Sequence, residues 1–210
     1  CKDSNMWFGI WRYSWMKLLF PRLVWNVPND SNVFLTFDDG PHPITTPKVL
    51  EVLKHFGVKA TFFCVGENIQ RYPEIIQDIE REGHVIGNHT YHHENGWSIP
   101  VDTYIESITR TSELIKSNLF RPPYGRINLR SINRLKNAGY QIIMWSWLSK
   151  DYNTNLKNTT IISAAKHIKA GDVLVFHDSQ KTEERIEELL MEIIPRIQSK
   201  QLTFSTFVTE

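Results

Sequence analysis

Two adjacent carboxylates, Asp38 and Asp39, directly follow a short β-prone run, Val33 to Phe37. Neighbouring carboxylates at one strand end repel each other unless something separates their roles. A bound metal ion does this, because one carboxylate can bind the ion while the other stays free to act as a base. A turn is the alternative interpretation, since Asp-Gly-Pro is also common turn chemistry. The turn accounts for Gly40 and Pro41, but not for both carboxylates.

Two histidines, His89 and His93, are the second feature that could do chemistry. Their spacing of four predicts two imidazoles on one side of a helical turn, suited to one divalent ion. His92 lies between them and adds ambiguity, and surface histidines also occur by chance, so the pair alone leaves metal binding undecided. Combined with Asp39, the pair makes a set of two histidines and one carboxylate. Such a set leaves open positions on the ion for water and substrate.

Further ionisable side chains end other β-prone runs. Arg121 ends one of them, and His177 and Asp178 end another. In α/β barrels the chemistry gathers at the carboxyl ends of the strands. A soluble barrel has no structural need for so many ionisable groups at one rim, so the clustering predicts an active site there. Taken singly, Arg121 could form a salt bridge to a loop, and His177 could be a core histidine capped by Asp178.

The elements that must position these residues alternate along the chain. Strand-like and helix-like segments follow one another from Val33 to Val208, which predicts an α/β fold with a mostly parallel sheet, either a barrel or a doubly wound sheet. Seven strand candidates are few for a full eight-fold barrel. A Gly-x-Gly-x-x-Gly motif does not follow the first strand, which disfavours a dinucleotide-binding sheet.

Several local expectations follow from the same reading. Thr46 and Gly57 are predicted to cap the two ends of one helix, and Asn128 to cap the start of another. The longest strand is expected over Tyr140 to Trp147. The only loop long enough to suggest a special role runs from Ser149 to Asn158.

Composition excludes some classes of function. The chain has 24 Lys and Arg against 23 Asp and Glu, which gives no electrostatic reason to expect a nucleic acid partner. Cys1 and Cys64 do not suggest a disulfide scaffold, and they form no CxxC metal pair. No apolar run reaches the length of about eighteen residues that a membrane-spanning helix needs.

Residues 1–30 are predicted to form an aromatic-rich N-terminal arm, followed by a single domain over residues 31–210. The arm mixes aromatic with basic residues, so it could contact a membrane interface. We favour an arm that packs on the domain. The charged residues do not fit the apolar region of a signal peptide, so no export signal is visible. The aromatic residues concerned are Trp7, Phe8, Trp11, Tyr13, Trp15, Phe20 and Trp25.

Four short motifs follow one another along the chain. They are Thr36-Phe37-Asp38-Asp39-Gly40-Pro41, His89-Thr90-Tyr91-His92-His93, Arg121-Pro122-Pro123-Tyr124-Gly125 and Val175-Phe176-His177-Asp178. With these motifs in this order, the chain resembles the NodB-homology polysaccharide deacetylases, also called carbohydrate esterase family four. The resemblance implies a distorted (β/α) barrel with about seven strands, and it implies that residues 31–210 are the catalytic domain.

The resemblance also implies a role for each motif residue. The metal is usually zinc in this family, with cobalt or nickel as substitutes. The implied roles are general base for Asp38, metal ligands for Asp39, His89 and His93, general acid for His177, support of the base for Arg121, and a backbone N–H for the oxyanion from Tyr124.

One motif departs from the family pattern. After the expected fifth strand the family usually has Trp-Ser-x-Asp-x-x-Asp-Trp, whereas this chain has Leu148 for the first Asp and Tyr152 for the final Trp. Asp151 remains and is the candidate to orient His177, although it could also be a solvated loop acid. We expect a different groove wall, and hence a different choice of substrate, more than a different reaction.

Three aromatic residues are candidates for substrate contact: Tyr124, Trp147 and Tyr152. The two tyrosines could stack on sugar rings or merely fill the rim. Trp145 and Trp147 lie one residue apart, so they share a face of the expected strand and one of them could belong to the core.

The leading hypothesis is a metal-dependent hydrolase that removes N-acetyl groups from a GlcNAc-containing polysaccharide, either peptidoglycan or a chitin-like polymer. One alternative keeps the machinery and changes the bond, giving an O-acetyl esterase that acts on a plant polysaccharide such as xylan. Another is a catalytically silent carbohydrate-binding domain. A wall polymer as substrate would imply action in the cell envelope or outside the cytoplasm.

Overall fold

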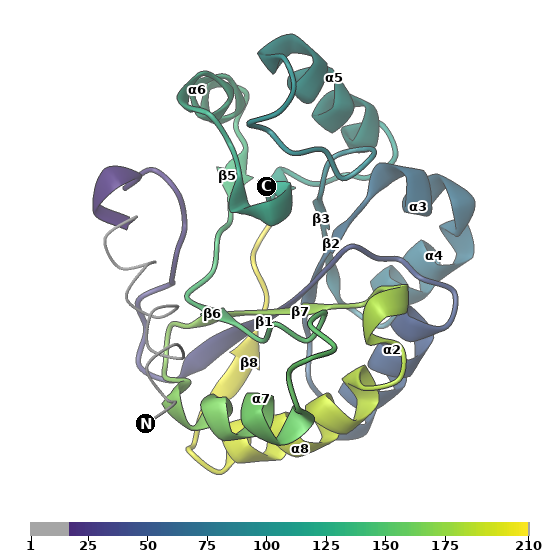
Figure 1. Cartoon of the computed structure of the whole chain (residues 1–210), viewed down its shortest axis with the longest axis vertical. Helices are drawn as coiled ribbons and strands as arrows, with labels where there is room; N and C mark the ends of the chain where they lie inside the picture. The colour runs from purple at the N-terminus through teal and green to yellow at the C-terminus, as the bar shows by residue number, and fades with distance from the viewer. Residues whose placement is uncertain (1–16, 210) are drawn as a thin grey trace.

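The computed structural model describes residues 17–209, in which parallel strands curl into an open barrel with helices around it (Figure 1). Seven strands follow one another in the order β5-β4-β3-β2-β1-β7-β6, and β8 pairs with the first residues of β1. The strands are β1 (Asn32–Asp38), β2 (Thr61–Cys64), β3 (Val85–Asn88), β4 (Leu119–Phe120), β5 (Gln141–Ile142), β6 (Trp147–Leu148), β7 (Val173–His177) and β8 (Thr203–Ser205). The predicted α/β class and the distorted barrel of about seven strands are confirmed.

The helices cover the outside of the sheet, and α2 and α7 each pack against α8 on one side of it (Figure 1). None of the helices in the described part of the chain is long and apolar enough to cross a membrane. The helices are α2 (Thr45–Phe56), α3 (Gly66–Arg71), α4 (Pro73–Arg81), α5 (Val101–Ser112), α6 (Leu129–Asn137), α7 (Asn158–Ala164) and α8 (Ile186–Gln198), with short 3-10 turns η1 (Pro123–Gly125), η2 (Ala165–His167) and η3 (Gln180–Thr182).

Alternate residues of β1 face two different clusters. Val33, Leu35 and Phe37 pack with the apolar faces of the surrounding helices in one buried cluster, and Phe34 belongs to a second. Because successive side chains of a strand point to opposite faces, Thr36 and Asp38 share the face of Phe34. The carboxylate of Asp38, the last residue of the strand, therefore lies on the face away from α2 and α8.

The barrel closes through the connection between β5 and β6. These two strands lie at opposite ends of the strand path, yet only residues 143–146 separate them. On one side Ile143 N donates to Phe120 O (2.8 Å), and on the other Ser146 N donates to Val173 O (3.1 Å). The connection thus joins β4 to β7 across the gap in the sheet.

The expectation of one long strand over Tyr140 to Trp147 is wrong, since the segment holds two short strands separated by an irregular stretch. The cause is a buried side chain. Arg121 Nε donates to Ile143 O (3.2 Å) and its Nη2 donates to Met144 O (3.1 Å). The carbonyls of this stretch are thus directed at a buried guanidinium instead of at a neighbouring strand of the sheet.

The helix ends agree with the sequence at two positions and differ at a third. Gly57 ends α2 in the left-handed region with φ 65°, and Asn128 Oδ1 accepts a bond from Ser131 N at the start of α6. The prediction that Thr46 caps α2 is wrong, because the helix begins at Thr45. Thr46 Oγ1 instead donates to Asp178 Oδ2 (2.6 Å), a carboxylate brought to it by the fold.

The described part of the predicted arm lies against the sheet. Val24 forms a parallel bridge with Ile143, and Asn26 forms an antiparallel bridge with Asp172. Trp25 between them is only 3% exposed. The aromatic residues from Trp7 to Trp15 lie outside the described residues, so the predicted membrane contact of the arm stays untested.

Candidate active site

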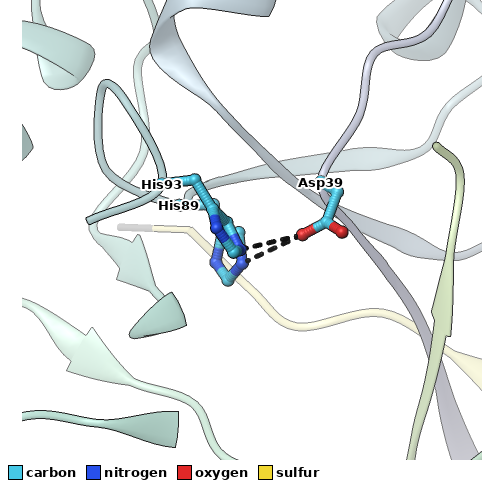
Figure 2. Close-up of side chains that lie close together, drawn as sticks. All are labelled: Asp39, His89 and His93. Carbon is cyan, nitrogen blue, oxygen red and sulfur yellow. Dashed lines mark ion pairs between the residues drawn. The ribbon is translucent and has the colours of Figure 1, made fainter. Parts of the chain in front are cut away.

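Three side chains gather at the carboxyl ends of β1 and β3. His89 Nε2 lies 3.6 Å and His93 Nε2 3.0 Å from Asp39 Oδ1. Figure 2 shows both imidazoles pointing toward the Asp39 carboxylate. One ligand atom from each residue lies within 4.8 Å of the others. The structure therefore brings together the three residues that the sequence proposed as metal ligands.

The geometry of this cluster fits a zinc-sized ion. Ligand atoms at about 2.0–2.2 Å from a tetrahedral zinc ion lie roughly 3–4 Å from one another. The separations of 3.0 and 3.6 Å match that spacing. His89 Nδ1 lies 2.8 Å from Arg121 O, a carbonyl that can only accept a hydrogen bond. The proton of a neutral His89 therefore sits on Nδ1, and the lone pair on Nε2 is free for an ion.

The two histidines do not lie on a helix, contrary to the sequence prediction. Residues 89–95 form an irregular segment in which Thr90 has φ 64° and His93 has φ 58°. Side chains take the bonds that a helix would have made. Thr90 N donates to Asn88 Oδ1 (2.9 Å), and Glu94 N donates to Thr90 Oγ1 (3.1 Å). Left-handed backbone at non-glycine residues is typical of functional sites, where the surroundings hold it in place.

Asp39 is charged although its side chain is partly buried. Burial alone would raise the pKa of its carboxyl, but hydrogen bonds with His89 and His93 and the charge of His177 hold the pKa well below 3.8. Its own φ is 77°, so the backbone turns sharply directly after β1. A carboxylate held ionised between two imidazoles is a suitable anionic ligand for a cation.

Arg121 supports the neighbouring carboxylate, Asp38. Its Nη1 lies 2.6 Å from Asp38 Oδ1 and donates to Thr36 Oγ1 at 2.6 Å as well. Its side chain is fully buried, and the guanidinium lies over the ring of Phe63. The buried carboxylate of Asp38 is thus paired with a buried cation. Thr36 was missed in the sequence, although a hydroxyl inside an otherwise apolar strand was a visible signal.

His177 lies directly across from Asp38, because the two residues are register partners on β7 and β1. Its Nδ1 lies 2.7 Å from Asp151 Oδ1, and its backbone N donates to Asp151 Oδ2 (2.8 Å). Burial alone would lower the pKa of His177, but the charge and hydrogen bond of Asp151, with Asp39 and Asp38, raise the pKa to about 9. The imidazole is therefore protonated at neutral pH and can donate a proton.

The three aromatic candidates lie in different places. Tyr124 is 62% exposed and its hydroxyl lies 3.1 Å from His93 Nδ1. Tyr152 is 41% exposed and its ring stands edge-on to His177. Trp147 does not reach the rim. It is 8% exposed and packs against Phe176 in the core, so its ring has no face free for a sugar.

The expectation that Trp145 and Trp147 share a face also fails. The irregular stretch before β6 breaks the alternation of a strand, and the two indoles belong to different buried clusters. An aromatic residue that the sequence did not single out is exposed instead. Trp97 is 65% exposed, and its indole N–H donates to Ile127 O (3.1 Å).

Comparison with known proteins agrees with this site. The polysaccharide deacetylase family model matches residues 26–143. A peptidoglycan-N-acetylglucosamine deacetylase of Bacillus cereus is 32% identical over 192 residues, which cover 88% of this chain and 90% of the relative. A chitooligosaccharide deacetylase of Azorhizobium caulinodans is 32% identical over 157 residues, which cover 71% of this chain and 75% of the relative.

Solved structures show the same likeness. The Bc1960 peptidoglycan N-acetylglucosamine deacetylase, in complex with 4-naphthalen-1-yl-N-oxidanyl-benzamide, superposes with a TM-score of 0.86 at 33% sequence identity. The match covers 91% of this chain and 94% of that one. The family model spans more than half of the chain, and the ordered motifs lie together at one end of the barrel. The chain therefore belongs to the polysaccharide deacetylase family, with the NodB-homology fold of carbohydrate esterase family four.

Proposed function

We propose that this chain is a metal-dependent hydrolase that removes N-acetyl groups from a GlcNAc-containing polysaccharide. The observation that carries the proposal is the placement of Asp38 and His177 on adjacent strand ends, next to the Asp39–His89–His93 cluster. One group can take a proton and the other can give one, beside a site that suits a cation. The names of the two relatives support an acetylated amino-sugar polymer as substrate.

The cofactor we propose is a divalent ion, zinc first, with cobalt or nickel as substitutes. Asp39, His89 and His93 would hold it, since two imidazoles and a carboxylate are a common ligand set for these metals. When bound, the ion supplies Lewis acidity, which polarises an acetamide carbonyl and makes water more acidic.

The residues of the chain then divide the proton transfers. Asp38 takes the proton from the attacking water, and Arg121 keeps that carboxylate in place. An amine is a poor leaving group, so His177 protonates the amide nitrogen as the C–N bond breaks, while Asp151 holds the imidazole. The products are acetate and a free amino sugar.

Substrate contacts are proposed for two exposed aromatic residues. Tyr124 lies beside His93, and Tyr152 lies beside His177. Their rings are the right kind of surface to stack on sugars, and the backbone N–H of Tyr124 is our candidate donor to the oxyanion. Trp147, which the sequence also suggested, is buried and is not proposed to contact the substrate.

The proposed substrate also suggests where the protein works. The Bacillus cereus relative acts, by its name, on peptidoglycan. A wall polymer lies outside the cytoplasmic membrane, so we propose a role in the cell envelope, with acetylated polysaccharide as the partner of the site.

Acetate release tests the function. The zinc-loaded protein would be incubated with N-acetylglucosamine oligomers, peptidoglycan and acetylated xylan, before and after removal of metal with a chelator. His89→Ala should abolish release, because it removes one ligand. His92→Ala is the matched control, since this exposed histidine lies outside the cluster and should leave release unchanged.

The outcomes separate the candidate functions. Release from an amide substrate that is lost with His89→Ala or with chelator supports the proposal and narrows the polymer. Release from xylan alone would make the protein an O-acetyl esterase. No release from any substrate, with zinc bound in stoichiometric amount, would favour a silent carbohydrate-binding domain.

A further inference from the structure

The loop from Ser149 to Asn158, which ends at the first residue of α7, carries Asp151, and one arginine outside the loop holds most of it. Arg185 lies between η3 and the first residue of α8. A loop without regular secondary structure must find other partners for its backbone carbonyls. A guanidinium offers five N–H donors in a fixed plane, so it can hold several carbonyls at once.

All of these donors go to this one loop. Nη1 donates to Asp151 O (3.0 Å) and Asn153 O (2.9 Å). Nη2 donates to Leu156 O (2.5 Å) and Asn158 Oδ1 (2.5 Å), and Nε donates to Asn158 Oδ1 (2.7 Å). The five bonds span eight residues of the loop and include the carbonyl of Asp151 itself.

The same segment is tied to the backbone of His177. Thr182 Oγ1 donates to His177 O (2.6 Å), and Arg185 N donates to Thr182 O (3.0 Å). One short stretch of chain therefore contacts both residues of the pair. The hydroxyl of Thr182 bonds to the backbone of His177, and the guanidinium of Arg185 bonds to the loop that carries Asp151. The relative position of these two residues depends on this stretch.

The contact between them leaves little freedom. Asp151 is fully buried, and both of its carboxylate oxygens bond to His177, one to the ring and one to the backbone. A shift of the Asp151 backbone would break this two-point contact and turn the imidazole. Misplacement of a reacting group by about 1 Å can lower a rate by roughly 100-fold.

We propose that Arg185 is a positioning residue, which fixes the Asp151–His177 pair by holding the loop behind it. The inference rests on the proposed function for the role of His177. Arg185 touches neither the metal ligands nor Asp38 among its contacts. Its guanidinium bonds to the backbone of Asp151, so this side chain acts on His177 through Asp151.

Kinetics of variants provide the first test. Arg185→Ala should lower kcat by about 10- to 100-fold. Arg196→Ala is the matched control, because Arg196 lies in α8, is exposed and pairs with Glu192 on the surface. Added guanidinium ion should partly restore kcat of Arg185→Ala, and should not restore Asp151→Asn.

A double-mutant cycle separates positioning from general damage to the fold. If Arg185 acts through Asp151, the double variant Arg185→Ala/Asp151→Asn should be no slower than Asp151→Asn alone. Losses that multiply in the double variant would overturn the proposal. So would a kcat of Arg185→Ala equal to that of Arg196→Ala.

A spectroscopic measurement tests the role of Arg185 independently of the proposed enzymatic function. In nitrogen-15 histidine-labelled protein, the Nδ1 proton of His177 bonded to Asp151 should give a low-field NMR signal, which Asp151→Asn removes. Arg185→Ala should broaden or shift that signal, and Arg196→Ala should leave it unchanged. An unchanged signal in Arg185→Ala would refute the proposal. An inactive wild-type protein with this pattern of signals would refute the function alone.

Discussion

Two buried ionisable side chains, Arg121 and Asp178, contact the turn that carries Asp38 and Asp39. The guanidinium of Arg121 donates to two backbone carbonyls, to the Thr36 hydroxyl and to the Asp38 carboxylate. These acceptors stabilise its charge inside the barrel. Asp178 has a bond from Thr46 to one oxygen, while its other oxygen has no hydrogen-bond partner among residues 17–209. A Cβ on Gly40 would lie 2.1 Å from Asp178 Oδ2, so only glycine lets the turn approach this carboxyl so closely.

Arg121→Lys should be strongly destabilising although it keeps the charge. A lysine cannot reproduce the fork that reaches Thr36, Ile143 and Met144, and each buried acceptor left unpaired costs about 1–3 kcal/mol. We expect the free energy of unfolding to fall by about 2 kcal/mol or more in urea titrations. Arg134→Lys, at an exposed arginine paired with Asp102, should stay within about 0.5 kcal/mol of wild type. Equal effects of the two substitutions would contradict this account.

Asp178→Asn should change how stability depends on pH. Burial raises the pKa of Asp178 to about 8, against a bond from Thr46 that lowers it. The folded protein therefore keeps a proton that the unfolded chain releases near pH 3.8, and this group makes folding less favourable as the pH rises between those values. Asparagine has no such proton, so the variant should gain stability relative to wild type as the pH increases.

Urea unfolding of the metal-free proteins at about pH 5 and about pH 8 measures this effect. Asp102→Asn is the control, because that side chain is 91% exposed. A difference between Asp178→Asn and wild type that is the same at both pH values would show that Asp178 is ionised in the folded protein.

At the scale of elements, the proposed metal ligands lie in loops, and side-chain hydrogen bonds hold these loops in place. The segment after β3 is shaped by Asn88, which accepts a bond from Thr90 N and donates to Ile108 O (2.8 Å). The next part of that segment is tied to the start of α6, since Asn128 Nδ2 donates to Gly96 O (3.1 Å). Asn128 thus has two functions, as cap of α6 and as a tether for the loop that follows the histidines.

Substitution of Asn128 separates these two functions. Asn128→Ala should cost about 1 kcal/mol of the free energy of unfolding through the cap. Asn128→Asp keeps the oxygen that accepts from Ser131 N and loses the amide donor to Gly96 O, so it should keep most of the stability. Chemical denaturation measures both. If the aspartate variant is as unstable as the alanine variant, the tether rather than the cap is what matters.

At the scale of the whole molecule, two segments close the barrel. One precedes the predicted start of the domain at residue 31, and the other follows it. Residues 143–146 join β4 to β7, and Val24 bridges to Ile143 in the same place. We therefore propose that residues 23–26 belong to the folded domain, although the sequence placed its start at residue 31.

Trp25→Ala tests this extension of the domain. The indole is 3% exposed and its N–H donates to Phe20 O (3.2 Å), so the substitution should cost about 3–5 kcal/mol of the free energy of unfolding. Leu18→Ala, at a residue that is 83% exposed in the same arm, should have an effect below about 0.5 kcal/mol. A thermal melt of both variants measures the difference, and a melting temperature of Trp25→Ala close to wild type would place residue 25 outside the domain.

The sequence by itself determined the class of the fold, the chemistry and the residues that gather around Asp39. Alternating strands and helices come from local periodicity, and the carboxyl ends of parallel strands necessarily meet at one edge. The gathering of the proposed metal ligands was predictable for the same reason, because His89 and Asp39 each directly follow a strand. The cap at Asn128 was predictable too, since capping depends on residues only three apart.

Only the tertiary structure decided which polar groups meet across the barrel. Arg121 and Asp38 are 83 residues apart. The other bonds of Arg121 reach Ile143 O and Met144 O, where the long strand that local pattern predicted is interrupted. The tertiary structure also decided the place of Thr46, which donates to Asp178 instead of capping a helix, and of Trp147, which packs into the core. Patterns in sequence report preferences within a few residues, whereas a buried polar group must take whatever partner the packed fold brings within hydrogen-bond distance.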